Sequence, residues 1–307
     1  MYFLAAADPT DHVTDKILLK IGDTPVLTMH MVTIVLVTIF FVWAMMQAAK
    51  AIATGPESEG NDRYLTKGKF GQIIEALVLY LRNEMLVPIL GEVQTRRYLP
   101  YLMTVFFFIL FNNLFGLLPI LDITHLVFGS DAKTWIGGTA TANIMVTGAL
   151  AFVSFVLIQI HGFRELGVKG WLEHLTGGLL NEKWYIWPVL LMVVPVELIG
   201  HLIKPMALAI RLFANMVAGH TLMAVLLGFG AAAATGGSSA FGIGAITLVS
   251  GVAAVIITFL ELFVSFLQAF IFMFLTAVFV SIMSHHDDEH EHENEQGEES
   301  ALEAVAG

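Results

Sequence analysis

The stretch from 203 to 220, IKPMALAIRLFANMVAGH, carries charged and polar side chains inside an apolar run that is long enough to cross a bilayer. Arg211 stands near the middle of this run, and a guanidinium cannot shed its proton to escape an apolar environment. Holding a charge at mid-membrane costs at least about 2.5 kcal/mol. Because no acidic residue lies within two turns of Arg211 in the sequence, we expect its charge to have a function beyond a local salt bridge.

A helical rotation of about 100° per residue divides the polar side chains of this run between two faces. His220, nine residues after Arg211, points to the side opposite Arg211. Lys204 lies two turns before Arg211. It has either a functional role or a structural one, in which its ammonium reaches the membrane surface or pairs with Glu197. One stripe about 80° wide holds Glu197, His201, Lys204, Leu208, Arg211 and Asn215.

A second long apolar run, at about 241–283, carries one acidic residue, Glu261. Ser265 and Gln268 follow at spacings of four and seven and therefore share the face of Glu261. An unpaired carboxylate inside a membrane is costly, and the imidazole of His220 is a suitable partner for it. Such groups exchange protons near neutral pH, so the pattern predicts a proton pathway.

The whole composition indicates that helices in a membrane position these side chains. Of 307 residues, 57% are apolar and 13% are charged, and the mean hydropathy is +0.77. Soluble proteins carry about 25% charged residues. The fold class we predict is an all-α polytopic membrane protein. The chain has no cysteine, which excludes disulfides and thiolate metal sites, and it has no basic footprint for nucleic acid. We expect no cofactor.

Hydropathy predicts five membrane-spanning elements and one amphipathic helix in the interface. An external segment at 1–24 precedes the membrane domain at 25–283, and an acidic, His-rich tail at 284–307 is expected to be disordered. The last two spans are about twice the length that one crossing needs, so we expect tilt, a hairpin, or kinks at Pro195 and Pro205. The predicted spans are about 25–46, 98–119, 142–160, 186–229 and 241–283, with the interfacial helix at about 70–90.

The distribution of Lys and Arg predicts the orientation in the membrane. Seven of these residues fall within 50–97 and three within a polar loop at 161–185, whereas 120–138 holds one and 230–240 holds none. The N-terminus is therefore expected outside and the C-terminus in the cytoplasm. No basic leader or transit-peptide pattern stands at the start, which favours the plasma membrane of a bacterium over an organelle-encoded copy.

The motifs KPMALAIRLFANMVAGH and LELFVSFLQAFIFMFLTAVFVS, together with NNLFGLLP, resemble subunit a of F-type ATP synthases over about 25–283. The resemblance implies a subunit whose two long, tilted helices lie against a rotating ring of c subunits. It also implies contacts with b-type peripheral stalk subunits and, indirectly, with the catalytic head sector. Protons would enter one half-channel, ride on ring carboxylates and leave by an offset half-channel; the subunit itself would not be the catalytic part.

The resemblance also implies roles for particular residues. Arg211 matches the arginine between the half-channels. Some bacterial members carry a glutamate at the position of His220 and a histidine at that of Glu261, so the two are expected to form one relay in the outer half-channel. The other implied positions are Asn215 and Gln268 near Arg211, Ser265 on the face of Glu261, and Glu197, His201 and Lys204 toward the cytoplasmic exit. Asn113 matches a polar position for which we predict no proton site.

Three alternatives remain open at this point. The translocated ion could be Na⁺, because the coordinating carboxylate belongs to another chain. A self-contained secondary transporter would predict inverted repeats, and none is visible. An intramembrane metalloprotease would need HExxH, and the segment ELIGH lacks it. The remaining histidines favour structural roles: His12, His125, His161 and His174 are expected in loops or termini, His30 near the outer interface, and the tail histidines at most as a weak metal site.

Overall fold

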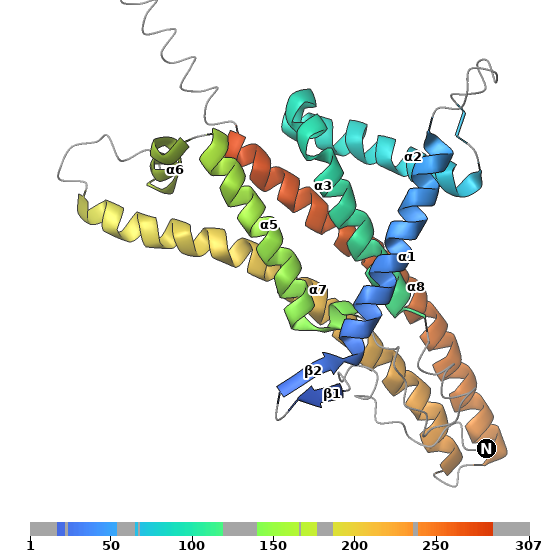
Figure 1. Cartoon of the computed structure of the whole chain (residues 1–307). Helices are drawn as coiled ribbons and strands as arrows, with labels where there is room; N and C mark the ends of the chain where they lie inside the picture. Colours follow the sequence, from blue (N-terminus) through green and yellow to red (C-terminus); the bar gives the residue numbers. More distant parts are fainter. Residues whose placement is uncertain are drawn as a thin grey trace, which may run out of the picture.

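The computed structural model describes residues 17–21, 24–53, 65–66, 68–118, 140–165, 167–176, 187–235 and 239–284. Within these ranges the protein is helical apart from one short hairpin (Figure 1). Five helical stretches are long and apolar enough to cross a membrane. The predicted fold class, with five spanning elements, is confirmed.

The first span is preceded by two short strands that the sequence analysis did not predict. β1 (Ile17–Ile21) and β2 (Thr24–Thr28) pair antiparallel, with Ile17 opposite Thr28. The hydroxyl of Thr28 then accepts a hydrogen bond from the backbone N–H of Met31 at 3.4 Å and caps α1 (Met29–Ile52). The helix therefore starts and ends later than the predicted 25–46, and its extra turns at 47–52 contain the strong helix formers Ala, Gln and Lys.

The predicted interfacial helix forms α2 (Lys69–Tyr80), continues through the π-helical turn η2 (Leu81–Leu86) and leads into α3 (Val87–Gly116). Gly91, with φ +72°, breaks the helical geometry and separates this segment from the span that follows. A left-handed φ suits glycine, which has no Cβ to clash. In Figure 1, α2 lies across the ends of α1 and α3. A Cβ placed on Gly71 would stand 2.8 Å from the Cβ of Ala51, so α2 sits tightly on the end of α1.

The third span is longer than predicted, and part of the expected loop at 161–185 is helical. A 3₁₀ turn, η3 (Ala140–Ala142), precedes α5 (Ile144–Glu165), and α6 (Gly167–Leu175) follows. Trp171 stacks on Phe163 with ring centroids 4.4 Å apart, and its indole N–H donates to Oε1 of Gln159 at 3.1 Å. These contacts fold α6 back onto α5, which is why a polar, charge-bearing segment here is not a loop.

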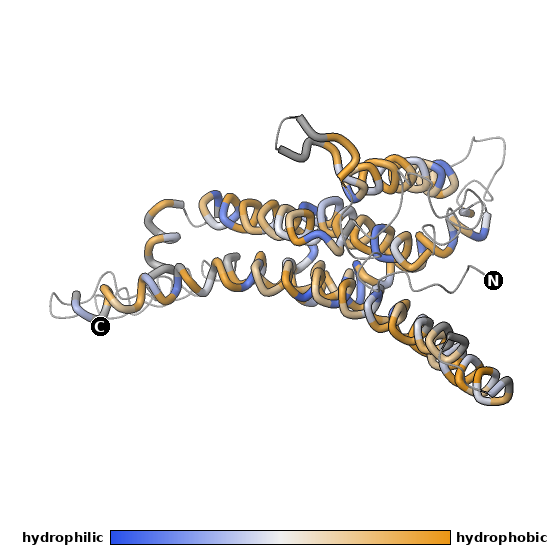
Figure 2. Tube along the Cα trace, turned by 90° about the horizontal axis from the view of Figure 1, so that it is seen from below, coloured by the Kyte–Doolittle hydropathy of each residue, from blue (hydrophilic) through white to orange (hydrophobic). Residues whose placement is uncertain are grey.

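The two long helices α7 (Trp187–Thr235) and α8 (Ala240–Ser284) pack against each other as a hairpin. Figure 1 shows their outer halves running side by side beyond the other helices, with α3 and α5 crossing their inner halves. α7 contains Pro195 and Pro205 within its length and bends in this view, as helices do at proline. Figure 2 shows both helices as apolar over most of their length. Phe106, Leu208, Leu212, Phe272 and Met273 belong to the core cluster that α3, α7 and α8 share.

Candidate functional site

Arg211 lies on the face of α7 that turns away from the rest of the described chain. Its side chain is exposed, whereas Leu208 and Leu212 are buried against the neighbouring helices. The exposed residues one turn to either side, Ala207 and Ala214, are small. Small side chains let the backbone of another helix approach closely. The arginine therefore stands among small, exposed residues, on a side of α7 that another helix can approach closely.

The predicted acid-bearing face of α8 points into the protein. Glu261, Ser265 and Gln268 are 3%, 0% and 3% exposed. In the part of the chain that the structure describes, neither carboxylate oxygen of Glu261 has a hydrogen-bond partner, nor do Ser265 Oγ and Gln268 Nε2. Asn215 Nδ2 on α7 is buried in the same way. Buried polar atoms normally have partners, and clusters like this one accommodate bridging water.

Glu261 packs directly on the backbone of α7 at Gly219. A Cβ built on Gly219 would fall 2.0 Å from Oε1 of Glu261 and 2.7 Å from its Cδ. Glycine is therefore required for this approach, because any larger residue would displace the carboxylate. His220, the predicted partner of Glu261, follows Gly219 directly and is half-buried with contacts of its own. The sequence prediction that the two positions meet stays a prediction, now with Gly219 as the contact point.

Asn113 joins three elements at this site, although the sequence analysis assigned it no role there. Its Nδ2 donates to the backbone carbonyl of Ser265 at 3.4 Å, and its Oδ1 accepts from the hydroxyl of Thr141 at 3.0 Å. The side chains of Asn113 and Thr141 are fully buried. The amide thus ties α3 and η3 to α8, one turn from Glu261. An Asn pair near the end of an apolar span was the signal that could have indicated such a link.

The residues predicted toward the cytoplasmic exit are not brought into this cluster. Lys204 is exposed, and its Nζ lies 5.4 Å from the ring centroid of Phe279 on α8. Glu197 is half-buried on α7 and makes contacts within the protein. His201 also belongs to α7, but its side chain lies outside the described structure.

His161, which was expected in a loop, is instead buried in α5, so that expectation is wrong. Its Nδ1 shares a hydrogen bond with the hydroxyl of Tyr98 on α3. One turn further along α3, the hydroxyl of Tyr101 lies 2.7 Å from Oγ of Ser154 on α5. These pairs link α3 to α5 and need no proton-path role. No group of three His, Cys, Asp or Glu that could hold a metal occurs among the described residues, which leave out His12, His125 and the His-rich tail.

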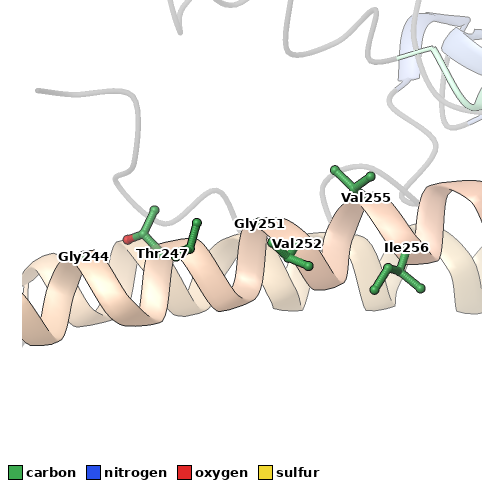
Figure 3. Close-up of a pocket in the computed structure, with 7 residues that line it drawn as sticks. Gly244, Thr247, Gly251, Val252, Val255 and Ile256 are labelled. Carbon is green, nitrogen blue, oxygen red and sulfur yellow. The ribbon is translucent and has the colours of Figure 1, made fainter.

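A separate groove of about 730 Å³ lies along the outer half of α8 (Figure 3). Figure 3 shows Val252, Val255 and Ile256 projecting from the front helix, α8, and Thr247 as the side chain drawn with an oxygen. The glycines Gly244 and Gly251 also line it. The groove contains no titratable side chain, so it adds no chemistry to the site around Glu261.

Comparison with known proteins shows the family to which the chain belongs. The family described as ATP synthase A chain matches residues 26–281. The ATP synthase subunit a of Myxococcus xanthus is 37% identical over 269 residues, which are 87% of this chain and 75% of that protein. The ATP synthase subunit a of Anaeromyxobacter dehalogenans strain 2CP-1 is 42% identical over 220 residues, 71% of this chain and 50% of that protein. The ATP synthase subunit a 2 of Chlorobaculum tepidum is 38% identical over 268 residues, which are 86% of this chain and 65% of that protein.

The chain thus spans about half to three quarters of the length of these relatives. The match covers all five spanning stretches and both long helices, and it leaves the secondary-transporter and metalloprotease alternatives without support. A multi-pass membrane chain with this match over most of its length is a member of the ATP synthase A chain family.

Proposed function

We propose that this chain is the stationary membrane subunit of a bacterial ATP synthase and passes protons to and from a rotating ring of c subunits. The observation that carries the proposal is the separation of two charged groups on α7 and α8. Arg211 is exposed on the outer face of α7, while Glu261 is 3% exposed between α7 and α8. This separation supports a role for the exposed group with a partner outside the chain and a role for the buried group in an internal path.

The exposed arginine acts on acids that arrive from the partner. A fixed cation beside a carboxylic acid favours its ionised form, so each ring carboxyl releases its proton as it passes Arg211. The same charge repels protons that would leak directly between the two half-channels. A lysine could lose its proton when desolvated, but a guanidinium cannot, which explains the choice of Arg. Each proton that crosses the membrane releases roughly 2.3 kcal/mol per 100 mV of membrane potential, and a direct leak would lose this free energy without turning the ring.

The outer half-channel in this proposal follows the buried polar atoms of α8 and α7. Glu261, Ser265 and Gln268 offer oxygen and nitrogen atoms that have no partner among the described residues, at successive turns of α8, and the buried Nδ2 of Asn215 is a further such atom on α7. Water that bridges such atoms would complete a proton-conducting chain. His220 and Glu261 form the acid–imidazole relay at its outer part. Glu197, and with it His201 and Lys204, would serve the exit toward the cytoplasm.

The partners follow from the same proposal: a c-ring on the face of Arg211, b-type stalk subunits, and the catalytic head sector at a distance. The N-terminus is outside and the C-terminus is in the cytoplasm, because the basic residues gather at 50–97. The chain contains no cysteine, so single cysteines placed at exposed Leu65 and Phe241 would be labelled from opposite sides of right-side-out cells. Labelling of Leu65→Cys by an impermeant reagent from outside would reverse the orientation.

The central experiment compares Arg211→Ala with Arg164→Ala, an exposed arginine at the end of α5. Both variants should insert and assemble. In energised membrane vesicles Arg211→Ala should abolish ATP synthesis, and Arg164→Ala should leave it within about twofold of the wild type, as expected for a surface substitution. Normal coupled synthesis by Arg211→Ala would refute the proposal.

Two further measurements test the finer parts. Exchanging the relay residues, His220→Glu with Glu261→His, should restore more proton flow than either single change. A double variant no better than the worse single variant would contradict the pairing. Synthesis driven by an imposed proton gradient in Na⁺-free vesicles should proceed at the full rate; dependence on added Na⁺ would show a Na⁺-translocating subunit instead.

A further inference from the structure

A groove of about 540 Å³ lies between α1, α2 and α3, away from the polar cluster at Glu261. Its only hydroxyl belongs to Thr104, which donates to the carbonyl of Pro100 at 2.6 Å and so has no donor left for a ligand. The groove therefore suits hydrocarbon, and its volume falls within the range of ligand-binding sites. The lining comprises Phe41, Val42, Met45, Met46, Ala48, Ala49 and Ile52 of α1, Ile74 and Val78 of α2, and Leu99, Pro100, Met103, Thr104 and Phe107 of α3.

The groove opens sideways toward the surrounding bilayer. Val42 and Met46, which form one wall, are 46% and 51% exposed. It occupies the last half of α1 and the middle turns of α3, from 99 to 107, and α2 lies across the ends of both helices that follow and precede these segments (Figure 1). In the orientation given above, this is the cytoplasmic leaflet, with α2 in the interface.

Basic side chains stand at the same end of the groove. Arg96 is exposed and precedes Met103 by seven residues, which places it on the groove-facing side of α3, about two turns closer to the membrane surface. Lys50 is exposed in the last turn of α1. Arg82, in contrast, is already paired with Glu92 at 2.8 Å. Two exposed cations thus lie within one helical turn of residues that line this end of the groove, Ala49 of α1 and Leu99 of α3.

We propose that this groove binds an anionic phospholipid of the cytoplasmic leaflet, with one acyl chain along α1 and α3 and the phosphate at Arg96 and Lys50. Arginine matches phosphate oxygens with two parallel N–H donors. Basic pockets between membrane helices on the cytoplasmic side are suited to anionic head groups. The inference concerns lipid binding and does not depend on the proton path.

The charge beside the groove favours a lipid over a helix from another subunit. A lipid brings a phosphate that Arg96 can bind with two parallel N–H donors, whereas an apolar membrane helix brings no anion to this place. A flexible acyl chain suits the apolar lining of the groove.

The test measures lipid retained by the purified whole ATP synthase complex after exchange into detergent with phosphatidylglycerol and phosphatidylethanolamine at equal amounts. Ala49→Trp fills the groove from an exposed position, and the complex should lose one bound phosphatidylglycerol. Gln47→Trp, exposed on the other side of α1, is the matched control and should retain it. Arg96→Gln should weaken retention about fivefold, the effect of one basic residue near an anionic surface, and Arg164→Gln should not.

Equal retention by wild type, Ala49→Trp and Arg96→Gln would overturn the proposal. So would equal retention of phosphatidylethanolamine, which would remove the head-group selectivity. Phosphatidylglycerol with a photoreactive acyl chain should label Met45 or Met103. A cross-linker placed at Met46 that captured a helix of another subunit instead would show a protein occupant and refute the lipid site. Because the readout is bound lipid, the result is independent of whether Arg211 variants lose ATP synthesis.

Discussion

Replacing Gly219 with alanine tests whether the contact between α7 and Glu261 matters to function. The added Cβ would lie 2.0 Å from Oε1 of Glu261, and ordinary contact begins at 3.4 Å. The carboxylate would therefore move by about 1.4 Å, since the backbone of a packed helix yields less readily than a side chain. Misplacing a reacting group by about 1 Å costs on the order of 100-fold in rate. We expect proton-driven ATP synthesis to fall by about that factor.

The assay is ATP synthesis by membrane vesicles at a fixed imposed gradient, with the amount of assembled complex measured in the same preparation. Gly200→Ala is the matched control, because the same substitution in α7 meets nothing within 4 Å. It should leave the rate unchanged. Combining Gly219→Ala with Glu261→Asp withdraws the carboxylate by one methylene and should recover part of the loss. If Gly219→Ala alone assembled normally and kept the rate within about twofold, the reasoning from this contact would be refuted.

Three further substitutions test the packing that positions the site. Asn113→Leu leaves the buried Thr141 hydroxyl without its acceptor and removes the bond that the Ser265 carbonyl accepts in addition to its helical one. The substitution should destabilise the assembled complex by about 1–3 kcal/mol, seen as a lower temperature of thermal aggregation. Tyr101→Phe should cost about 1 kcal/mol in detergent unfolding, and no additional loss should appear when Ser154→Ala is added. Gly91→Ala forces a left-handed φ on an L-residue and should cost about 1–2 kcal/mol, whereas Gly148→Ala, with a helical neighbourhood free of close contacts, should not.

The sequence predicted the membrane elements because hydrophobic length is a direct physical requirement of a bilayer. The five spanning stretches follow from it, and the amphipathic α2 follows from the helical spacing of its apolar residues. The ends of the elements did not follow, since they depend on local contacts. Thr28 caps α1 only because the chain arrives as a strand, and Trp171 holds α6 against α5 by stacking on Phe163. Neither contact is encoded in apolar periodicity.

Helical phase predicted part of the site. It separated the face of Arg211 from that of His220 and grouped Glu261 with Ser265 and Gln268, and the structure has the latter three buried together. It could not predict Asn113, because a hydrogen bond to a residue 152 positions away depends on how α3 crosses α8. It also missed the burial of His161. A histidine near a charged segment looks like a loop residue until its tyrosine partner on another helix is known.

The spacing of Arg211, Asn215 and Gly219 explains how one helix can serve both an exposed charge and a buried acid. Each step of four residues advances about 6 Å along α7 and rotates about 40° around it. Arg211 therefore faces out, Gly219 faces Glu261 about 80° away, and Asn215 lies between them with its Nδ2 buried and unpaired within the described chain. In the proposed path, a proton leaving Glu261 for a carboxyl at Arg211 crosses this interval. Asn215 is the polar group that α7 contributes there, and Ser265 and Gln268 are the buried polar groups of α8.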